Sequence, residues 1–262
     1  MSGGPTARSP AETRGPDLEV GQCVYAVVVA TEGRVPEGLR GIDDAPLQLV
    51  ELGDIAAVTA DLRIDRPPGR RADLLAYSSV LDALASSGAV VPVQFGSVLP
   101  DQQSVVDDVL APQADFFREL LAQLTGRAQF NVRADYDEQV ILAEVVATDR
   151  TVAALREHTR GLPEEAAYAD RVRLGELVAQ AVEHKREIDT EVLLDAIVPF
   201  TVDHRVSPGT GLDGVMSAAV LVDDDQREQF EEQLEALAEV VHERIRLRLV
   251  GPVPPYDFVG AA

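Results

Sequence analysis

Three patterns in this sequence contain residue types that could do chemistry: a glycine-rich loop, a run of aspartates and a set of histidines. Residues 209–214 read Gly-Thr-Gly-Leu-Asp-Gly and match the G-x-G-x-x-G pattern that holds the pyrophosphate of a dinucleotide. That binding mode needs a helix directly after the loop, because the helix N-terminus supplies free N–H groups. Residues 215–222 have the composition of a strand, so the sequence predicts a loop between two strands.

Three consecutive aspartates at 223–225 could hold a divalent cation, because hard cations prefer clustered oxygen ligands. The run lies between an expected strand and an expected helix, where aspartate side chains cap free backbone N–H groups. It also lacks the spacing and the glycine of a calcium-binding loop. The pattern therefore favours helix capping over metal binding.

Neither the four histidines nor the single cysteine lies in a catalytic or metal-binding pattern. The histidines stand at positions 158, 184, 204 and 242 without paired-ligand spacing. Cys23 falls in an apolar run, without neighbours that would activate its thiol. No nucleophile elbow or Walker loop occurs. We therefore predict a protein that is not an enzyme and has no catalytic residue, metal ligand or cofactor.

Length and charge limit the remaining function classes. The chain has 262 residues, enough for two domains, and its 45 acidic against 23 basic residues give a net charge of −22. This charge repels phosphate backbones and anionic lipids, so we expect no nucleic-acid and no membrane partner. One cysteine suits a reducing compartment, and residues 1–20 have no apolar signal core. The sequence predicts a cytoplasmic protein with a disordered start at 1–20.

The first half of the chain predicts an N-terminal α+β domain over 21–126. β-Branched residues predict a buried strand at 23–30, and Gly53-Asp54 predicts a hairpin between strands at 47–52 and 55–60. A helix should follow from residue 72, then a strand at 89–93 and a helix at 104–124 kinked by Pro112. The expected inward side chains of the two helices are Leu74, Leu75, Val80, Leu81, Leu84, and Val105, Val109, Phe116, Leu120, Leu124.

The second half alternates in the order strand, helix, strand, strand, helix, strand. The expected elements are a strand at 128–132, helices at 138–158 and 164–195, strands at 196–203 and 215–222, a helix with Phe230, Leu234, Leu237 and Val241 inward, and a strand at 245–250. The inward face of the longest helix should contain Leu174, Leu177, Val178, Ala181, Ile188 and Val192. This βαββαβ order is typical of a ferredoxin-like domain, predicted here for 127–250 with a helical insertion. The fold class is thus α+β with two domains.

The tail at 251–262 combines prolines with aromatic side chains. Its prolines exclude a helix or a central strand and stiffen the chain, which lowers the entropy lost on docking. Tyr256 and Phe258 are too apolar for a solvated tail, so they either pack on their own protein or contact a partner. We expect the tail to fold back and clamp the two domains. Glutamates along the preceding helix form either a solvated face or an electrostatic guide for a basic partner: Glu228, Glu231, Glu232, Glu235, Glu239 and Glu243.

Two segments carry a family resemblance. Residues 90–98, Val-Val-Pro-Val-Gln-Phe-Gly-Ser-Val, and 251–259, Gly-Pro-Val-Pro-Pro-Tyr-Asp-Phe-Val, resemble the VLPxRFGT and GPWPPYxFV signatures of the gas vesicle protein GvpL/GvpF family. The resemblance covers about residues 22–260, with the motifs in the family's order. Tyr77, Gln94 and Val253 stand where the family usually has histidine, arginine and tryptophan, which suggests an adapted partner surface.

The resemblance implies an accessory protein of gas vesicle assembly. Such a protein would associate with gas vesicles, bind the main shell protein (GvpA-type), contact other accessory proteins and support nucleation or growth of the shell. The candidate structural or partner-contact residues are Phe95, Gly96, Pro254, Pro255, Tyr256 and Phe258. The alternatives are a permanent component of the shell, and a ferredoxin-like small-molecule-binding regulatory protein or enzyme.

Overall fold

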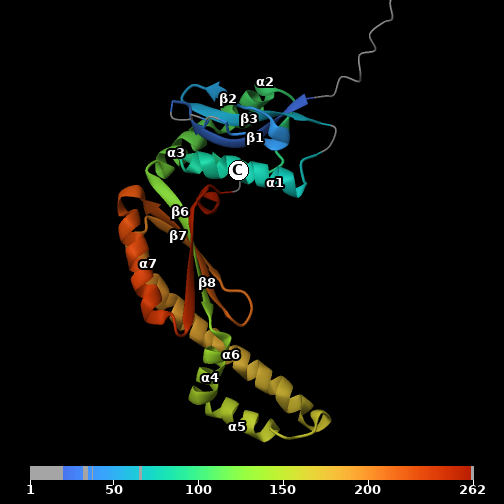
Figure 1. The fold of residues 1–262 in the computed structure, drawn as a ribbon, viewed down its shortest axis with the longest axis vertical. Coiled ribbons are helices and arrows are strands. Elements are labelled where there is room, and N and C mark those ends of the chain that lie inside the picture. The colour runs from blue at the N-terminus through green and yellow to red at the C-terminus, as the bar shows by residue number, and fades with distance from the viewer. Residues whose placement is uncertain (1–19, 32–34, 37, 65–66, 261–262) are drawn as a thin grey trace, which may run out of the picture.

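The chain folds around two antiparallel sheets that follow one another in sequence (Figure 1). The computed structural model describes residues 20–31, 35–36, 38–64 and 67–260. The predicted disordered start therefore lies outside the described residues, except for Val20. Sheet 1 uses strands of the first half and sheet 2 strands of the second half, and the change occurs between residues 124 and 127.

Sheet 1 has the strand order β2-β3-β1-β4, with a short β5 also paired to β1. Its strands are β1 (Val20–Val29), β2 (Leu47–Leu52), β3 (Ile55–Arg63), β4 (Val90–Pro92) and β5 (Val98–Leu99). The predicted hairpin is confirmed: β2 pairs with β3, and Gly53 in the turn has φ +66, a conformation that favours glycine. β1 is apolar at almost every position because it is central and apolar clusters cover both of its faces.

Helices cover both faces of sheet 1. α1 (Arg71–Ala85) packs on one face through Tyr77, Val80 and Leu81. The opposite face is covered by α2 (Gln102–Ser104), a π-helix (Val105–Leu110), a 3₁₀ turn (Ala111–Gln113) and α3 (Ala114–Leu124). Pro112 lies in the 3₁₀ turn, where the predicted helix changes its geometry.

The predicted inward faces of these helices are partly wrong. Leu74 and Leu75 are 49% and 56% exposed, whereas Asp73 is buried. The Asp73 carboxylate accepts hydrogen bonds from two backbone N–H groups at the start of α1, which turns this position inward. In α3, Phe117 is buried and Phe116 is exposed, because the π and 3₁₀ turns before α3 rotate its inward face relative to an uninterrupted helix.

Sheet 2 has the strand order β7-β8-β6-β9, and every pair is antiparallel. Its elements in chain order are β6 (Arg127–Tyr136), α4 (Glu138–Thr148), α5 (Arg150–Thr159), α6 (Glu164–Ile197), β7 (Asp203–Pro208), β8 (Gly214–Asp223), α7 (Arg227–Val241) and β9 (Ile245–Val253). α7 and the C-terminal part of α6 pack on one face of the sheet, with Phe230 and Leu234 buried as predicted. α4, α5 and the remainder of α6 project beyond the sheet as a helical arm (Figure 1).

Two predicted elements of the second half are wrong. The helix expected at 138–158 is divided, because the Asp149 carboxylate accepts hydrogen bonds from Thr151 N and Val152 N and starts a new helix, α5. The strand expected at 196–203 is the end of α6 followed by a 3₁₀ turn, and β7 begins only at residue 203. Its apolar composition is that of a buried helix end, which a short apolar run does not distinguish from a strand.

The expected inward face of α6 is partly wrong as well. Ile188 and Val192 are about half exposed, whereas Val182, Leu193 and Ile197 are buried. The helix contacts α4 and α5 along its N-terminal part and sheet 2 near its C-terminal end. One continuous apolar stripe cannot face both the α4–α5 pair and sheet 2, so the buried positions of α6 change along its length.

Candidate functional site

The C-terminal tail joins the two sheets. After β9, the chain crosses from sheet 2 to the β4 edge of sheet 1 and ends beside α1 (Figure 1). Val259 is 4% exposed and belongs to the same apolar cluster as Val24 and Val91 of sheet 1. Leu221 of β8 lies in that cluster too. Both sheets and the tail therefore share one apolar core.

Polar contacts hold the tail on the side of sheet 2. Gln129 Nε2 donates a hydrogen bond to Asp257 Oδ2 at 2.6 Å, and Asp257 N donates to Gln129 Oε1 at 3.3 Å. The Arg205 guanidinium lies over the Phe258 ring, 5.3 Å from its centroid. Because Gln129 is only 2% exposed, losing the tail would leave its buried amide with fewer partners.

A groove of about 410 Å³ opens where the tail meets α1 and the segment after β4. Its lining residues are Leu74, Tyr77, Ser78, Pro92, Val93, Gln94, Phe95, Tyr256, Val259 and Gly260. The groove thus brings together the two segments, 90–98 and 251–259, that the sequence singled out. Leu74 and Tyr256 are each about half exposed beside it. An apolar groove with exposed aliphatic and aromatic side chains can hold apolar side chains of a partner.

Tyr77 connects the groove to the core. Its hydroxyl donates a hydrogen bond to the carbonyl oxygen of Val93, and the carbonyl oxygen of Tyr25 lies 3.2 Å away. Its ring stacks on Tyr25 at 5.4 Å between centroids and meets Phe95 edge-on at 5.1 Å. Burial, with a smaller contribution from Tyr256, raises the pKa of Tyr77, so its hydroxyl stays a donor. Tyr77 thus links Tyr25 and Phe95 in one aromatic cluster.

The predicted contact residues lie around this groove with different exposures. Phe95 lines it, and Gly96 makes the following turn with φ +90. Pro254 and Pro255 are buried, whereas Tyr256 is half exposed. Phe258 packs against the shared apolar core. Pro254, Pro255 and Phe258 are therefore buried or packed against the core, whereas Phe95 and Tyr256 remain at least partly exposed at the groove.

Gly251 lies in β9 against the core of sheet 2. A Cβ there would lie 2.5 Å from Cδ1 of the buried Phe130. We expect Gly251→Ala to cost about 1–3 kcal/mol through this overlap, a fall in melting temperature of about 2–12 °C, measured by calorimetry. Gly175→Ala in α6 is the control, because nothing lies within 4 Å of its Cβ; it should be neutral or stabilising. Equal melting of the Gly251 variant and the parent would contradict this packing.

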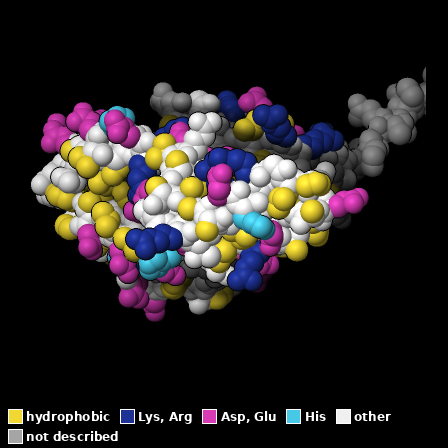
Figure 2. Space-filling view, turned by 90° about the horizontal axis from the view of Figure 1, so that it is seen from below, with side chains coloured by type: hydrophobic (Ala, Val, Ile, Leu, Met, Phe, Trp, Pro, Cys, Tyr) yellow, Lys and Arg dark blue, Asp and Glu magenta, His cyan; other side chains and the backbone are white. Residues whose placement is uncertain are grey.

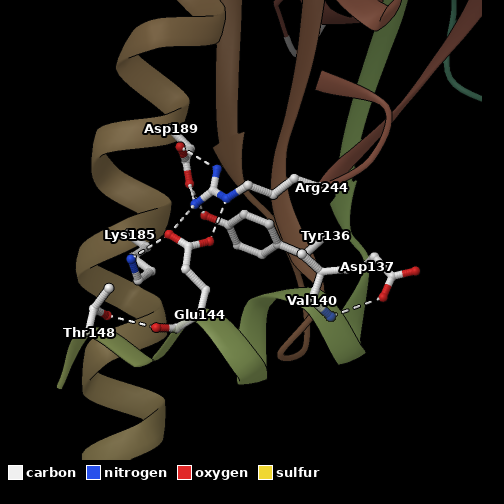
Figure 3. A network of polar contacts seen from close by, with 8 residues as sticks. All are labelled: Tyr136, Asp137, Val140, Glu144, Thr148, Lys185, Asp189 and Arg244. Atoms are coloured by element: carbon white, nitrogen blue, oxygen red, sulfur yellow. Dashed lines mark hydrogen bonds and ion pairs between the residues drawn. The ribbon is translucent and has the colours of Figure 1, made fainter. Parts of the chain in front are cut away.

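A second polar cluster, which the sequence did not predict, joins the helical arm to sheet 2 (Figure 3). Arg244, directly before β9, donates to Glu144 of α4 at 2.7 Å and to both carboxylate oxygens of Asp189 in α6 at 2.7 Å. Lys185 Nζ donates to Glu144 Oε1 at 2.6 Å, and the Tyr136 hydroxyl donates to Asp189 Oδ2 at 2.5 Å. All the charged groups of this cluster are therefore paired.

The pairing suits a structural role. Hydrogen bonding to Asp189 outweighs burial and raises the pKa of Arg244, and burial raises the pKa of Tyr136. Burial acts to raise the pKa of Glu144, but hydrogen bonds from Arg244 and Lys185 outweigh it and hold that pKa below 4.5. Arg244 and Glu144 are therefore charged near neutral pH and Tyr136 is neutral, and none of the three lines the groove at the tail or the groove between α4, α5 and α6. The cluster holds α4 and α6 against the end of the sheet.

The helical arm contains its own apolar groove, of about 450 Å³, between α4, α5 and α6. Its lining residues are Gln139, Leu142, Ala143, Val146, Val152, Arg156, Leu174 and Val178. Figure 2 views the molecule from this end and shows hydrophobic side chains interspersed with acidic and basic ones. The two polar lining residues do not form the convergent set that typically orients a small ligand.

The other patterns from the sequence have structural explanations. The glycine-rich loop joins β7 to β8 as predicted, and a Cβ on Gly209 would lie 2.2 Å from the backbone of Gly214, so the loop closes too tightly for a side chain. The capping prediction for the aspartates is wrong, because Asp223 instead pairs with Arg127 at 2.9 Å and the cap residue before α7 makes no side-chain cap. Asp224 and Asp225 lie within a 3₁₀ turn (Asp224–Gln226), so Gln226 rather than an aspartate occupies the position directly before α7.

The single cysteine is a packed core residue. Cys23 is fully buried, and burial raises the pKa of its thiol to about 11, so it is protonated and packed. Within the described ranges, no group of three or more His, Cys, Asp or Glu side chains could hold a metal ion. None of the helices in the described part of the chain is both long and apolar enough to cross a membrane.

Comparisons with known proteins agree with this architecture. A family profile described as gas vesicle synthesis protein GvpL/GvpF matches residues 21–260. Gas vesicle protein F of a Streptomyces species is 31% identical over 238 residues, covering 90% of this chain and 98% of that protein. Gas vesicle protein L of the same strain is 31% identical over 258 residues, covering 92% and 93%.

Two solved structures share the fold. The crystal structure of gas vesicle protein GvpF from an Anabaena species has a TM-score of 0.78 at 22% identity, covering 92% of this chain and 99% of that one. GvpF from Microcystis aeruginosa has a TM-score of 0.73 at 21% identity, covering 91% and 98%. The profile spans both signature segments and both sheets, and this chain therefore belongs to the gas vesicle synthesis protein GvpL/GvpF family.

Proposed function

We propose that this protein is a non-catalytic accessory factor of gas vesicle assembly that binds the main shell protein and supports nucleation or growth of the shell. Family membership implies a role in gas vesicle assembly. The observation that supports the finer proposal is the groove at the tail, where the two signature segments meet beside the exposed Leu74 and Tyr256. Such a groove suits an apolar segment of a shell subunit.

The proposal includes an architecture and a location. Residues 21–126 and 127–250 would be two domains, the second ferredoxin-like, held in one orientation by the tail at 251–262. The strand order β7-β8-β6-β9 and the order of strands and helices in the second half support this division. The protein would act in the cytoplasm in association with gas vesicles, together with the shell protein and other accessory proteins.

Two neighbouring leucines of α1 allow a matched test of the groove. Leu74 lines the groove and Leu75 does not, although both are about half exposed. We expect Leu74→Asp to weaken capture of the main shell protein about tenfold or more, as for a contact at the centre of an interface. Leu75→Asp should bind like the parent. The measurement is co-purification of the tagged protein with the shell subunit, quantified against input.

The outcomes separate the candidate functions. Equal capture by both leucine variants would place the shell contact elsewhere, and no capture by the parent would reject the binding proposal. A small-molecule function would instead predict a ligand in the groove of the helical arm, and the scarcity of polar side chains in that lining favours the assembly role. Retention of the protein on urea-washed vesicles would assign it to the shell rather than to transient assembly.

A further inference from the structure

The face of sheet 2 opposite α6 and α7 carries a group of arginines, Arg133, Arg205, Arg246 and Arg248, here called the arginine face. Residues paired in an antiparallel sheet project from the same side, and the register pairs Arg133 with Arg248 and Asp135 with Arg246. Arg205 lies in the row that continues through Ala219 and Asn131 to Val250. All four arginines are exposed. In a chain of net charge −22, this face is a local basic surface.

The chain neutralises this surface only in part. Arg133 donates to both oxygens of Asp135, and Arg205 pairs with Asp203 at 2.6 Å. Arg246 and Arg248 form no ion pair with any other described residue. Arg248 also lies directly opposite Arg133 in the register, and like charges in that position destabilise a sheet. A negatively charged partner would relieve this repulsion.

The complementary charge lies on the other side of the same sheet. The outer side of α7 presents four exposed glutamates, Glu228, Glu232, Glu235 and Glu239, and the exposed Glu243 follows just after the helix ends at Val241. In the last turn of the same helix, Val240 is 81% exposed, the most of any large hydrophobic side chain in the described ranges. Val250 on the arginine face is 50% exposed. Each surface therefore combines an excess of one charge sign with an exposed valine.

We propose that the arginine face of one copy binds the outer side of α7 of a second copy. The two surfaces lie on opposite sides of one sheet, so the contact is head-to-tail and can repeat along a stack. Arginine–glutamate pairs would align the two copies, and the two valines would exclude water between them. This self-association uses neither the groove at the tail nor the proposed shell contact.

Ionic strength gives the proposal a distinctive signature. Two copies of net charge −22 repel at long range, whereas the arginine–glutamate contacts act at short range. The Debye length is about 8 Å at physiological ionic strength, about 30 Å at 0.01 M and about 3 Å at 1 M. Association should therefore be weak at the lowest salt, strongest near physiological ionic strength and weak again near 1 M.

The test is the molar mass of the full chain against concentration, measured by sedimentation equilibrium near physiological ionic strength. We expect the average mass of the parent to rise with concentration. Arg246→Ser/Arg248→Ser and Glu239→Gln/Glu243→Gln should each associate at least tenfold more weakly. In an equimolar mixture, the intact α7 surface of the arginine variant should bind the intact arginine face of the glutamate variant. The mixture should therefore form a heterodimer and nothing larger, because each variant keeps only one intact surface.

A matched control removes the same charge from another place. Arg171→Ser/Arg173→Ser changes two exposed arginines of α6 and should associate like the parent. Circular dichroism establishes that every variant is folded. A parent that stays monomeric at all concentrations and salts would overturn the proposal. So would a mixture of the two variants that fails to pair, or an arginine-face variant that associates like the parent.

Discussion

Replacing Val259 by aspartate is expected to release the C-terminal tail and to lower the melting temperature by about 4–12 °C. Val259 is 4% exposed within the core shared by both sheets, and burial of such a side chain contributes about 2–3 kcal/mol. Each kcal/mol corresponds to about 2–4 °C for a protein of this size. A carboxylate cannot remain in that core without a partner, so the tail should undock rather than accommodate it.

Calorimetry and amide hydrogen exchange together test this expectation. Exchange should accelerate at residues 254–260 and along β4, because the tail covers that edge of sheet 1. Val172→Asp is the control, since Val172 is 48% exposed on α6 and the two residues have similar helix propensities. Unchanged melting and exchange in the Val259 variant would mean that the tail is not a clamp.

The tail also allows stability and partner binding to be separated. Tyr256 is half exposed and Phe258 packs against the shared core. In the same calorimetry, Tyr256→Ala should leave the melting temperature nearly unchanged. In the co-purification assay, it should weaken capture of the shell protein. The double change Tyr256→Ala/Phe258→Ala should affect both. A double variant that melts and binds like the parent would assign the tail neither role.

Arg244→Met is expected to destabilise the protein by about 2–3 kcal/mol near neutral pH. Breaking a fully buried ion pair costs about 3–5 kcal/mol because a charge is left without its partner. Here the side chains of Arg244, Glu144 and Asp189 are 29%, 31% and 16% exposed, and water screens part of the loss. Methionine keeps much of the arginine's apolar stem, so the change isolates the charge.

The destabilisation caused by Arg244→Met should become smaller as the pH falls. Pairing holds the pKa of Glu144 below 4.5 in the folded state, so the stability it supplies is present above that pH and is lost as the pH falls through the folded pKa. Urea unfolding should show a large difference between parent and variant near neutral pH and a smaller one well below pH 4.5. Arg118→Met, which breaks a surface pair with Asp54, should change little at either pH. A pH-independent difference would contradict the charge explanation.

Local signals in the sequence were sufficient where one short-range interaction controls the geometry. Gly53 supplied the left-handed turn residue between β2 and β3. The spacing of Phe230 and Leu234 predicted the inward face of α7, which packs on a single sheet. The strand at residues 215–222 excluded a helix after the glycine-rich loop, and β8 occupies that position.

Predictions from the sequence failed where contacts with other residues changed which side chains a segment buries or which secondary structure it forms. The Asp73 carboxylate caps the start of α1, so Asp73 lies on the inward face of the helix and Leu74 and Leu75 do not. α6 contacts two neighbours along its length, so one apolar stripe did not describe it. The end of α6 has strand-like composition, and its helical state follows from burial of Leu193 and Ile197 against sheet 2.

The sequence by itself determined the alternation of elements, the acidic character of the chain and the two segments that indicate the family. Only the tertiary structure decided that Phe95 and Tyr256 line one groove, and that Arg244 pairs with Glu144, 100 residues away. It also decided that arginines of three strands share one face. The physical reason is that proximity between distant residues depends on strand order, register and packing of the whole chain, whereas residue spacing encodes only the face that each element buries.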